Sequence, residues 1–212
     1  MLTYQTYIFD CDGVLLDSNQ LKAKAFYEVA QPYGEEVALA LEAYHQQHGG
    51  VSRYKKFEYF FKTLLRLSDA DPQIQEAITR FSQISLEKLL QCPETEGMQE
   101  FLEKRPAQSK SYVISGGAQT EVQAVFQQRH LEHYFESIYG SPEDKITLLQ
   151  RLKNQGQLIA PYVFIGDSIT DYEAAQAFGL DFVFMWQYTI LPDWQAYFRG
   201  KSVRLIQNLK YW

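Results

Sequence analysis

The chain has 212 residues, of which 46% are hydrophobic and 22% are charged, and its formal net charge is −6. This composition excludes a disordered chain and supplies enough apolar residues for a packed core. The acidic balance argues against non-specific nucleic-acid binding, because such binding depends on Lys and Arg meeting phosphates. We expect a folded protein of one or two domains that has no nucleic-acid partner.

The cysteines and the first residues indicate the cellular setting. Cys11 and Cys92 are too few for a disulfide framework at this length, and their spacing forms no zinc pattern. Residues 1–10 lack the basic segment and apolar run of a signal peptide. No apolar stretch reaches the roughly 18 residues that a membrane span needs. We expect a cytoplasmic protein without a membrane partner; the sequence leaves its oligomeric state open.

Short apolar segments followed by polar turns predict strands along the chain. The first covers residues 4–9, and the others are expected at residues 111–114, 162–165, 181–185 and, more weakly, 202–206. Helical patterns lie between them, at about residues 121–129, 144–155 and 171–178. Strands that alternate with helices predict an α/β fold: a Rossmann-like, doubly wound parallel sheet with helices on both faces.

Residues 20–91 break this alternation. Apolar residues between Phe57 and Leu65 recur at helical spacing, and Asp71-Pro72 resembles a helix start. The stretch is too long for one crossover helix, so we predict an inserted, all-helical cap domain. The predicted boundaries are residues 1–18 and 93–212 for the catalytic core and residues 19–92 for the cap.

Polar residues follow three of the expected strands at the point where each strand ends. They are Asp10-Cys11-Asp12-Gly13, Ser115-Gly116 and Gly166-Asp167. In an open parallel sheet, ligands bind at the carboxyl ends of the strands. These residues are therefore expected to converge in space, although they lie far apart in the sequence.

Asp10 and Asp12 place two carboxylates at the end of the first strand. In one dry pocket they would repel each other unless a divalent cation or a shared proton reduced the repulsion. One carboxylate can attack a phosphorus atom while the other gives a proton to the leaving oxygen. Gly13 permits the sharp turn that brings backbone N–H groups toward a phosphate.

Asp167 and Asp171 add two more carboxylates at i, i+4 spacing, which allows both to lie on one side of a loop that becomes a helix. Carboxylate oxygens suit a hard cation such as Mg²⁺, and no His or Cys cluster indicates zinc. Ser115 and the amide of Gly116 can bind phosphate oxygens. Lys145, at the head of a helical pattern, can neutralise the nucleophile and the transferring phosphoryl group.

Together these four elements resemble the motifs of the haloacid dehalogenase-like hydrolase superfamily. Residues 10–18 look like the first motif, residues 114–117 like the second, Lys145 like the third and residues 166–171 like the fourth. They occur in the family's order and extend over the whole chain. The resemblance implies a Rossmann-like core with a helical cap inserted after the first motif.

The same resemblance implies roles for the motif residues. Asp10 would be the nucleophile, and Asp12 the general acid and then the base for the hydrolytic water. The Asp10 carboxylate, the Asp12 backbone carbonyl and Asp167 would hold Mg²⁺, with Asp171 as a further ligand or an outer-shell support. The phosphoryl-binding residues would be Ser115, Gly116 and Lys145.

The acidic residue at position 12 favours an oxygen leaving group over a halide or a phosphonate carbon. The leading hypothesis is a magnesium-dependent phosphatase for a small phosphorylated metabolite, such as a sugar phosphate or a phosphoglycolate-like acid. A sugar phosphomutase of the β-phosphoglucomutase type is the alternative. A non-catalytic regulatory or binding protein is a third hypothesis, although no motif residue is lost.

A Gly-Gly loop in the expected cap, His48-Gly49-Gly50-Val51-Ser52-Arg53, could face the site. Ser52 is predicted as a helix N-cap. Arg53 could bind a second anionic group of the substrate, since similar Gly-x-Ser-Arg segments occur in the caps of sugar-phosphate mutases of this superfamily. The pattern leaves Arg53 open between a substrate contact and a structural role.

Overall fold

The computed structural model describes residues 3–212 and contains one all-parallel sheet with the strand order β3-β2-β1-β4-β5-β6. Its strands are β1 (Thr6–Phe9), β2 (Lys110–Ala118), β3 (Ser137–Ser141), β4 (Tyr162–Gly166), β5 (Asp181–Met185) and β6 (Arg204–Ile206). The order reverses between β1 and β4, which is the topological switch point of a doubly wound sheet. The predicted Rossmann-like fold class is confirmed.

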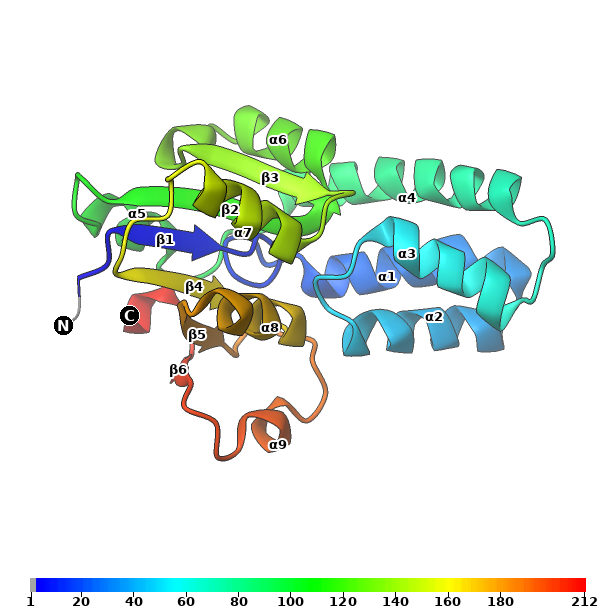
Figure 1. Cartoon of the computed structure of the whole chain (residues 1–212). Coiled ribbons are helices and arrows are strands. Elements are labelled where there is room, and N and C mark those ends of the chain that lie inside the picture. The colour runs from blue at the N-terminus through cyan, green and yellow to red at the C-terminus, as the bar shows by residue number, and fades with distance from the viewer. Residues whose placement is uncertain (1–2) are drawn as a thin grey trace.

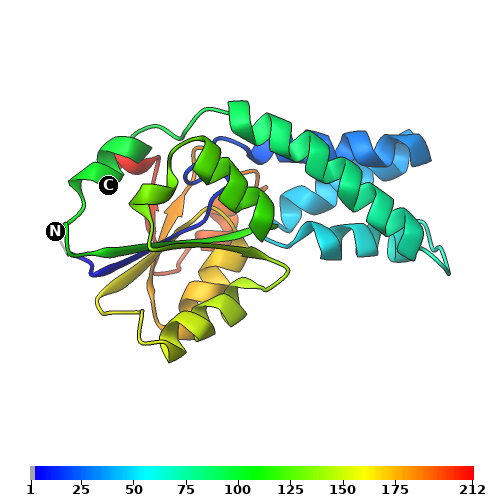
Figure 2. The same cartoon turned by 90° about the horizontal axis from the view of Figure 1, so that it is seen from above.

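Helices cover both faces of this sheet (Figures 1 and 2). The helices are α1 (Asn19–Ala30), α2 (Glu35–Gln47), α3 (Arg53–Glu58), α4 (Asp71–Gln91), α5 (Met98–Lys104), α6 (Gln119–Gln128), α7 (Lys145–Asn154), α8 (Ile169–Phe178) and α9 (Trp194–Phe198). Single turns of 3₁₀ helix are η1 (Gln31–Tyr33), η3 (Glu132–Tyr134) and η4 (Leu209–Tyr211), and η2 (Tyr59–Leu64) is a π-helix. Helices α5 and α6 lie on one face of the sheet, and α7 and α8 on the other (Figure 2). In residues 3–212, no helix has the length and apolar character to cross a membrane.

Strand β1 shows how the sequence divides the core into two layers. Tyr7 and Phe9 pack with the α5 and α6 side, whereas Ile8 between them packs with the α7 and α8 side. Successive side chains of a strand point to opposite faces, so a strand that is buried at every position, as β1 is, must be covered on both faces.

Residues 19–91 are all described and contain no strand. Helices α1–α4 lie beyond the carboxyl ends of the strands, toward which the arrowheads of β1 and β3 point in Figure 1. They have an apolar core of their own that contains Phe26, Phe57 and Phe81. The division into a core and a cap domain at the stated boundaries stays a prediction, and residues 1 and 2 of that core range lie outside the described residues.

Three local expectations can be compared with these elements. Helix α4 begins at Asp71 with Pro72 in its first turn, as expected. Ser52 occupies the N-cap position of α3, as expected, although its side chain makes no capping hydrogen bond. Strand β3 at Ser137–Ser141 was not anticipated, and β2 continues through the glycines after Ser115 to Ala118.

Candidate active site

The predicted convergence at the carboxyl edge of the sheet is present in the structure. Asp10 follows β1 and its backbone N–H donates to Ile165 O at 3.0 Å, which ties the end of β1 to β4. Asp167 follows β4, and Lys145 is the first residue of α7. All three side chains are buried, with residues 3–5% exposed. The edge therefore holds charged groups that have little access to solvent.

Three of these carboxylates form a compact cluster. One oxygen from each of Asp10, Asp167 and Asp171 lies within 4.8 Å of the others. The cluster is faced by the Lys145 ammonium and by the Asn19 side-chain amide, which donates to Asp167 Oδ2 at 2.7 Å. Burial, followed by the negative charges of Asp10 and Asp171, raises the pKa of Asp167 well above its usual value. One lysine does not balance three carboxylates, so the donor set fits a hard divalent cation.

Lys145 bridges two members of the cluster. Its Nζ lies 2.7 Å from Asp10 Oδ1 and 2.5 Å from Asp171 Oδ1. Burial acts to lower the pKa of Lys145, but the two carboxylates reverse this and raise it, so the lysine stays protonated. Burial raises the pKa of Asp10 to about 7 against the opposing effect of Lys145. Lys145 is thus the fixed positive charge beside the predicted nucleophile.

The oxygens of Asp171 are already used within the protein. Oδ2 accepts hydrogen bonds from the backbone N–H groups of Asp167 at 3.2 Å and Ser168 at 3.1 Å, and from Ser168 Oγ at 2.6 Å. Oδ1 accepts from Lys145. A Cβ at Gly166 would lie only 2.3 Å from the Asp171 Cβ, so the loop closes tightly around this carboxylate. Because both oxygens of Asp171 are already bonded, the contacts favour outer-shell support of the metal site over direct binding of the cation.

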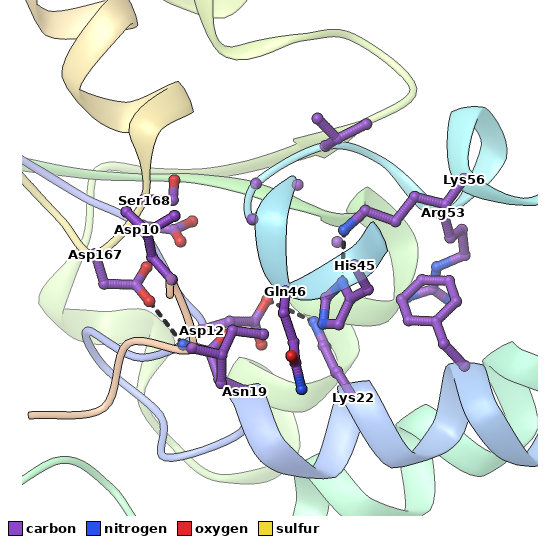
Figure 3. A pocket seen from close by; sticks show the side chains of 18 of the residues that line it. Asp10, Asp12, Asn19, Lys22, His45, Gln46, Arg53, Lys56, Asp167 and Ser168 are labelled. Atoms are coloured by element: carbon purple, nitrogen blue, oxygen red, sulfur yellow. Dashed lines mark hydrogen bonds and ion pairs between the residues drawn. The ribbon is translucent and has the colours of Figure 1, made fainter. Parts of the chain in front are cut away.

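Asp12 has a different environment, although it lies only two residues from Asp10. Its Oδ2 is 2.6 Å from Lys22 Nζ (Figure 3). Its Oδ1 accepts from Ser18 Oγ at 2.6 Å. Burial acts to raise the pKa of Asp12, but Lys22 and Ser18 outweigh it and lower the pKa below its usual value. Two neighbouring carboxylates with pKa values shifted in opposite directions are an arrangement expected for separate chemical roles.

The second predicted motif lies beside the Gly-Gly loop. Ser115 is buried and its Oγ accepts from the Gly117 N–H at 3.0 Å. A Cβ at Gly116 would be 2.3 Å from Gly50 O, so only glycine lets the loop approach this closely. Thr170 Oγ1 donates to Gly49 O at 2.8 Å and ties the loop to the start of α8.

A pocket lies between this edge and the helices α1–α4 (Figure 3). The sheet side contributes Asp10, Asp12, Gly116, Gly117, Asp167 and Ser168, and the helical side contributes Lys22, Phe26, His45, Arg53, Lys56 and Phe81. Carboxylates therefore line one side and cations the other. With a cation held by the carboxylates and with Lys145 beside Asp10, a phosphate ester could be bound with its phosphoryl group toward Asp10 and its leaving group toward the helices.

Residues 7–185 match the model of the haloacid dehalogenase-like hydrolase family. The chain belongs to this family. It is 25% identical over 211 residues to the phosphorylated carbohydrates phosphatase of Thermotoga maritima, with 96% of this chain and 94% of that protein covered. These findings confirm the predicted family and the predicted enzyme class, a haloacid dehalogenase-like phosphoric monoester hydrolase.

Solved structures share the fold of this haloacid dehalogenase-like hydrolase. One is a hydrolase from Pseudomonas syringae, with a TM-score of 0.75, 20% identity and coverage of 98% of this chain and 95% of that one. Another is a haloacid dehalogenase-like family protein from Streptococcus pneumoniae, with a TM-score of 0.71, 18% identity and coverage of 99% and 97%. At these identities the likeness concerns the fold alone.

Arg53 lines the pocket of this hydrolase, but its guanidinium is bonded within the protein. It forms a two-pronged ion pair with Glu121 of α6, in which Nη1 lies 2.9 Å from Oε2 and Nη2 contacts Oε1. Nη1 also donates to Ser82 Oγ at 2.9 Å, and Ser85 Oγ donates to Glu121 Oε1 at 3.1 Å. The pair joins α3 to the core helix α6, which supports the structural reading of Arg53.

Replacement of Glu121 by glutamine is expected to destabilise the protein by about 3 kcal/mol, because it leaves the buried Arg53 charge uncompensated. Urea unfolding followed by circular dichroism measures the change. The control is Glu100→Gln, which breaks an exposed pair with Lys104 and is expected to cost less than about 1 kcal/mol. Equal effects of the two substitutions would contradict a structural role for the Arg53–Glu121 pair.

Sequence reasoning did not find four residues that line this site, Asn19, Lys22, His45 and Lys56, nor Glu121, the partner of Arg53. Asn19 and Lys22 could have been predicted from the sequence, because both lie in the first turn of the helix that follows the first motif and their spacing places them on one face. His45, Lys56 and Glu121 carry no comparable local signal. Their positions depend on how the helices pack against the sheet.

Proposed function

We propose that this hydrolase is a magnesium-dependent phosphatase of a small phosphorylated carbohydrate and that it works through an aspartyl phosphate on Asp10. The observation that carries the proposal is the buried three-carboxylate cluster beside Lys145, with Asp12 held apart from it by Lys22. The phosphatase of Thermotoga maritima, named for phosphorylated carbohydrates, supports this substrate class.

The cation would be held by the carboxylates of Asp10 and Asp167, with the Asp12 backbone carbonyl predicted as a further ligand. Asp171 would support them by fixing Lys145 and the loop after β4. When bound, Mg²⁺ supplies positive charge that offsets the repulsion between carboxylates and phosphoryl oxygens.

In the first step an oxygen of ionised Asp10 forms a bond to phosphorus as the bond from phosphorus to the leaving alcohol oxygen breaks. Lys145, at 2.7 Å from Asp10, stabilises the charge on the transferring group. Ser115 and the backbone at Gly116 are the proposed contacts of the phosphoryl oxygens. Asp12 gives its proton to the leaving oxygen.

In the second step water attacks the phosphorus of the aspartyl phosphate, Asp12 takes the proton of that water, and the bond to Asp10 breaks. The contact with Lys22 favours ionised Asp12, which is the form this second step needs. The first step needs the protonated form. The Asp12 carboxyl group must therefore lose its contact with Lys22 and contact the substrate before it acts as an acid.

The proposal is tested by measuring phosphate release from a panel of phosphorylated sugars and sugar acids, with Mg²⁺ and with a chelator. Release that depends on Mg²⁺ supports it and removes the non-catalytic hypothesis. No release from any ester in the presence of Mg²⁺ would refute it. The mutase alternative was motivated by the two aspartates and by the Gly-x-Ser-Arg-like segment, whose Arg53 is bonded to Glu121. Formation of an isomeric sugar phosphate in place of phosphate would favour it over the phosphatase.

A further inference from the structure

A buried lysine–histidine pair lies on the helical side of the pocket. Lys56 Nζ is 2.6 Å from His45 Nδ1, and Lys56 reaches toward His45 in Figure 3. The residues are 1% and 6% exposed, and both line the pocket. Within residues 3–212, His45 Nε2 has no hydrogen-bond partner. The pair thus places an amine and this ring nitrogen at the buried wall of the pocket.

The other cations of this pocket differ from Lys56 because each contacts a carboxylate. Lys22 contacts Asp12, and Arg53 contacts Glu121. The partner of Lys56 is an imidazole, and its ammonium lies 5.3 Å from the centre of the Phe26 ring. A buried ammonium beside neutral groups carries a desolvation cost that a carboxylate or phosphate would offset.

The protonation of the pair follows from this burial. Burial, reinforced by Lys22, lowers the pKa of Lys56 to about 7; Asp12 and Asp10 oppose this shift, and Lys145 adds to it. Burial and the charges of Lys56 and Lys22 lower the pKa of His45 well below its usual value, so the imidazole is neutral. With Nδ1 accepting from Lys56, the ring proton is on Nε2, which makes Nε2 a donor.

We propose that Lys56, positioned by His45, binds a second anionic group, a carboxylate or a phosphate, on the leaving group of the substrate. The inference rests on the proposed phosphatase function and narrows its substrate to a phosphorylated sugar acid or a bisphosphate. The anion would accept from the Lys56 ammonium, whereas His45 Nε2–H points away from Lys56 and would donate to another oxygen of the same leaving group. Arg53 lies on the same face of α3 as Lys56, but its guanidinium is paired with Glu121. Lys56 is therefore the residue of α3 that we expect to bind the anion.

Matched esters test this inference, because each pair carries the same phosphoryl group and differs in the leaving group. The carboxylate arm compares 3-phosphoglycerate with glycerol 3-phosphate and 6-phosphogluconate with glucose 6-phosphate. The phosphate arm compares glucose 1,6-bisphosphate with glucose 6-phosphate. We expect kcat/KM of the wild-type enzyme to favour the anionic member of at least one pair by about tenfold or more.

The Lys56→Met variant is expected to lose that preference, because its kcat/KM for the anionic ester falls by about tenfold more than its kcat/KM for the neutral ester. The matched control is Lys62→Met, which removes an exposed lysine of the same helical region and should keep the preference. A His45→Asn variant, expected to weaken the preference in the same direction, serves if Lys56→Met fails to fold.

A pH series gives a second readout that needs no variant. The phosphoryl groups of a matched pair titrate alike, so the ratio of their kcat/KM values reports the charge on Lys56. Lys56 is charged below its pKa of about 7, so preference for the carboxylate ester should be greatest below that pH and decline above it. The exposed Lys62 should have no part in this decline.

Equal kcat/KM values for the members of every pair, or a preference that Lys56→Met retains, would overturn the inference and leave the phosphatase proposal intact. If none of the esters is hydrolysed, the phosphatase proposal fails first. Calorimetric binding of the same compounds to Asp10→Asn protein with Mg²⁺ then tests the pair directly. Equal Kd values for anionic and neutral members would refute it, and tighter binding of the anionic members would support it.

Discussion

Asp10→Asn enzyme is expected to hydrolyse phosphate esters about a thousandfold more slowly than wild type, or worse, because an amide cannot form the acyl phosphate. Asp10 is 3% exposed, belongs to the three-carboxylate cluster and contacts Lys145. Among the carboxylates that line the pocket, Asp10 is the one that contacts the Lys145 ammonium, since Asp12 contacts Lys22 instead. Steady-state phosphate release with Mg²⁺ measures the loss.

Two controls separate loss of chemistry from loss of folding. Asp69→Asn removes one exposed negative charge and should keep the wild-type rate. The thermal midpoint of Asp10→Asn should not fall, because the substitution removes one of three mutually repelling buried carboxylates and leaves Lys145 paired with Asp171. A variant that hydrolyses esters at the wild-type rate would place the nucleophile elsewhere.

The sheet was predictable where strands are continuously apolar. Strand β5 has the predicted bounds, and β1 and β4 agree closely with prediction, because they are buried on both faces. Strand β3 was missed because Ser-Ile-Tyr-Gly-Ser is short and mostly small or polar, as an edge strand can be. The end of β2 was misplaced because Gly116 and Gly117 resemble a turn; they remain in the strand across a register shift.

The convergence of the motif residues could be predicted from the sequence for a related reason. Parallel strands that end at one edge bring Asp10 and Asp167 together whatever the rest of the chain does. Lys56 and Glu121 are different, since local patterns assign charged side chains to solvent. Their burial arises when α3 packs against α4 and when Arg53 meets the core helix α6. Such contacts join segments far apart in the sequence, so no local spacing reports them.

The second large effect is expected at Asp167. Mg²⁺ should raise the thermal midpoint of the wild-type protein, by an amount that corresponds to about 2.7 kcal/mol at a hundredfold excess over Kd. Asp167→Asn should show little of this rise and should lose about a thousandfold in kcat, because the cation is no longer held beside Asp10. Differential scanning calorimetry, with Mg²⁺ and with chelator, measures the shifts.

When metal is absent, Asp167→Asn is expected to stabilise the protein against thermal unfolding. In chelator, Asp167→Asn should unfold at a higher temperature than wild type, since the buried Asp167 carboxylate lies beside Asp10 and Asp171 and its own hydrogen bond comes from the neutral Asn19 amide. Asp69→Asn, with the same change in net charge on the surface, should leave both the midpoint and the Mg²⁺ response unchanged. A cluster that destabilises the empty protein and stabilises the loaded one behaves as an ion site rather than as a structural network. An Asp167→Asn protein that responds to Mg²⁺ as wild type does would show that the ion binds elsewhere.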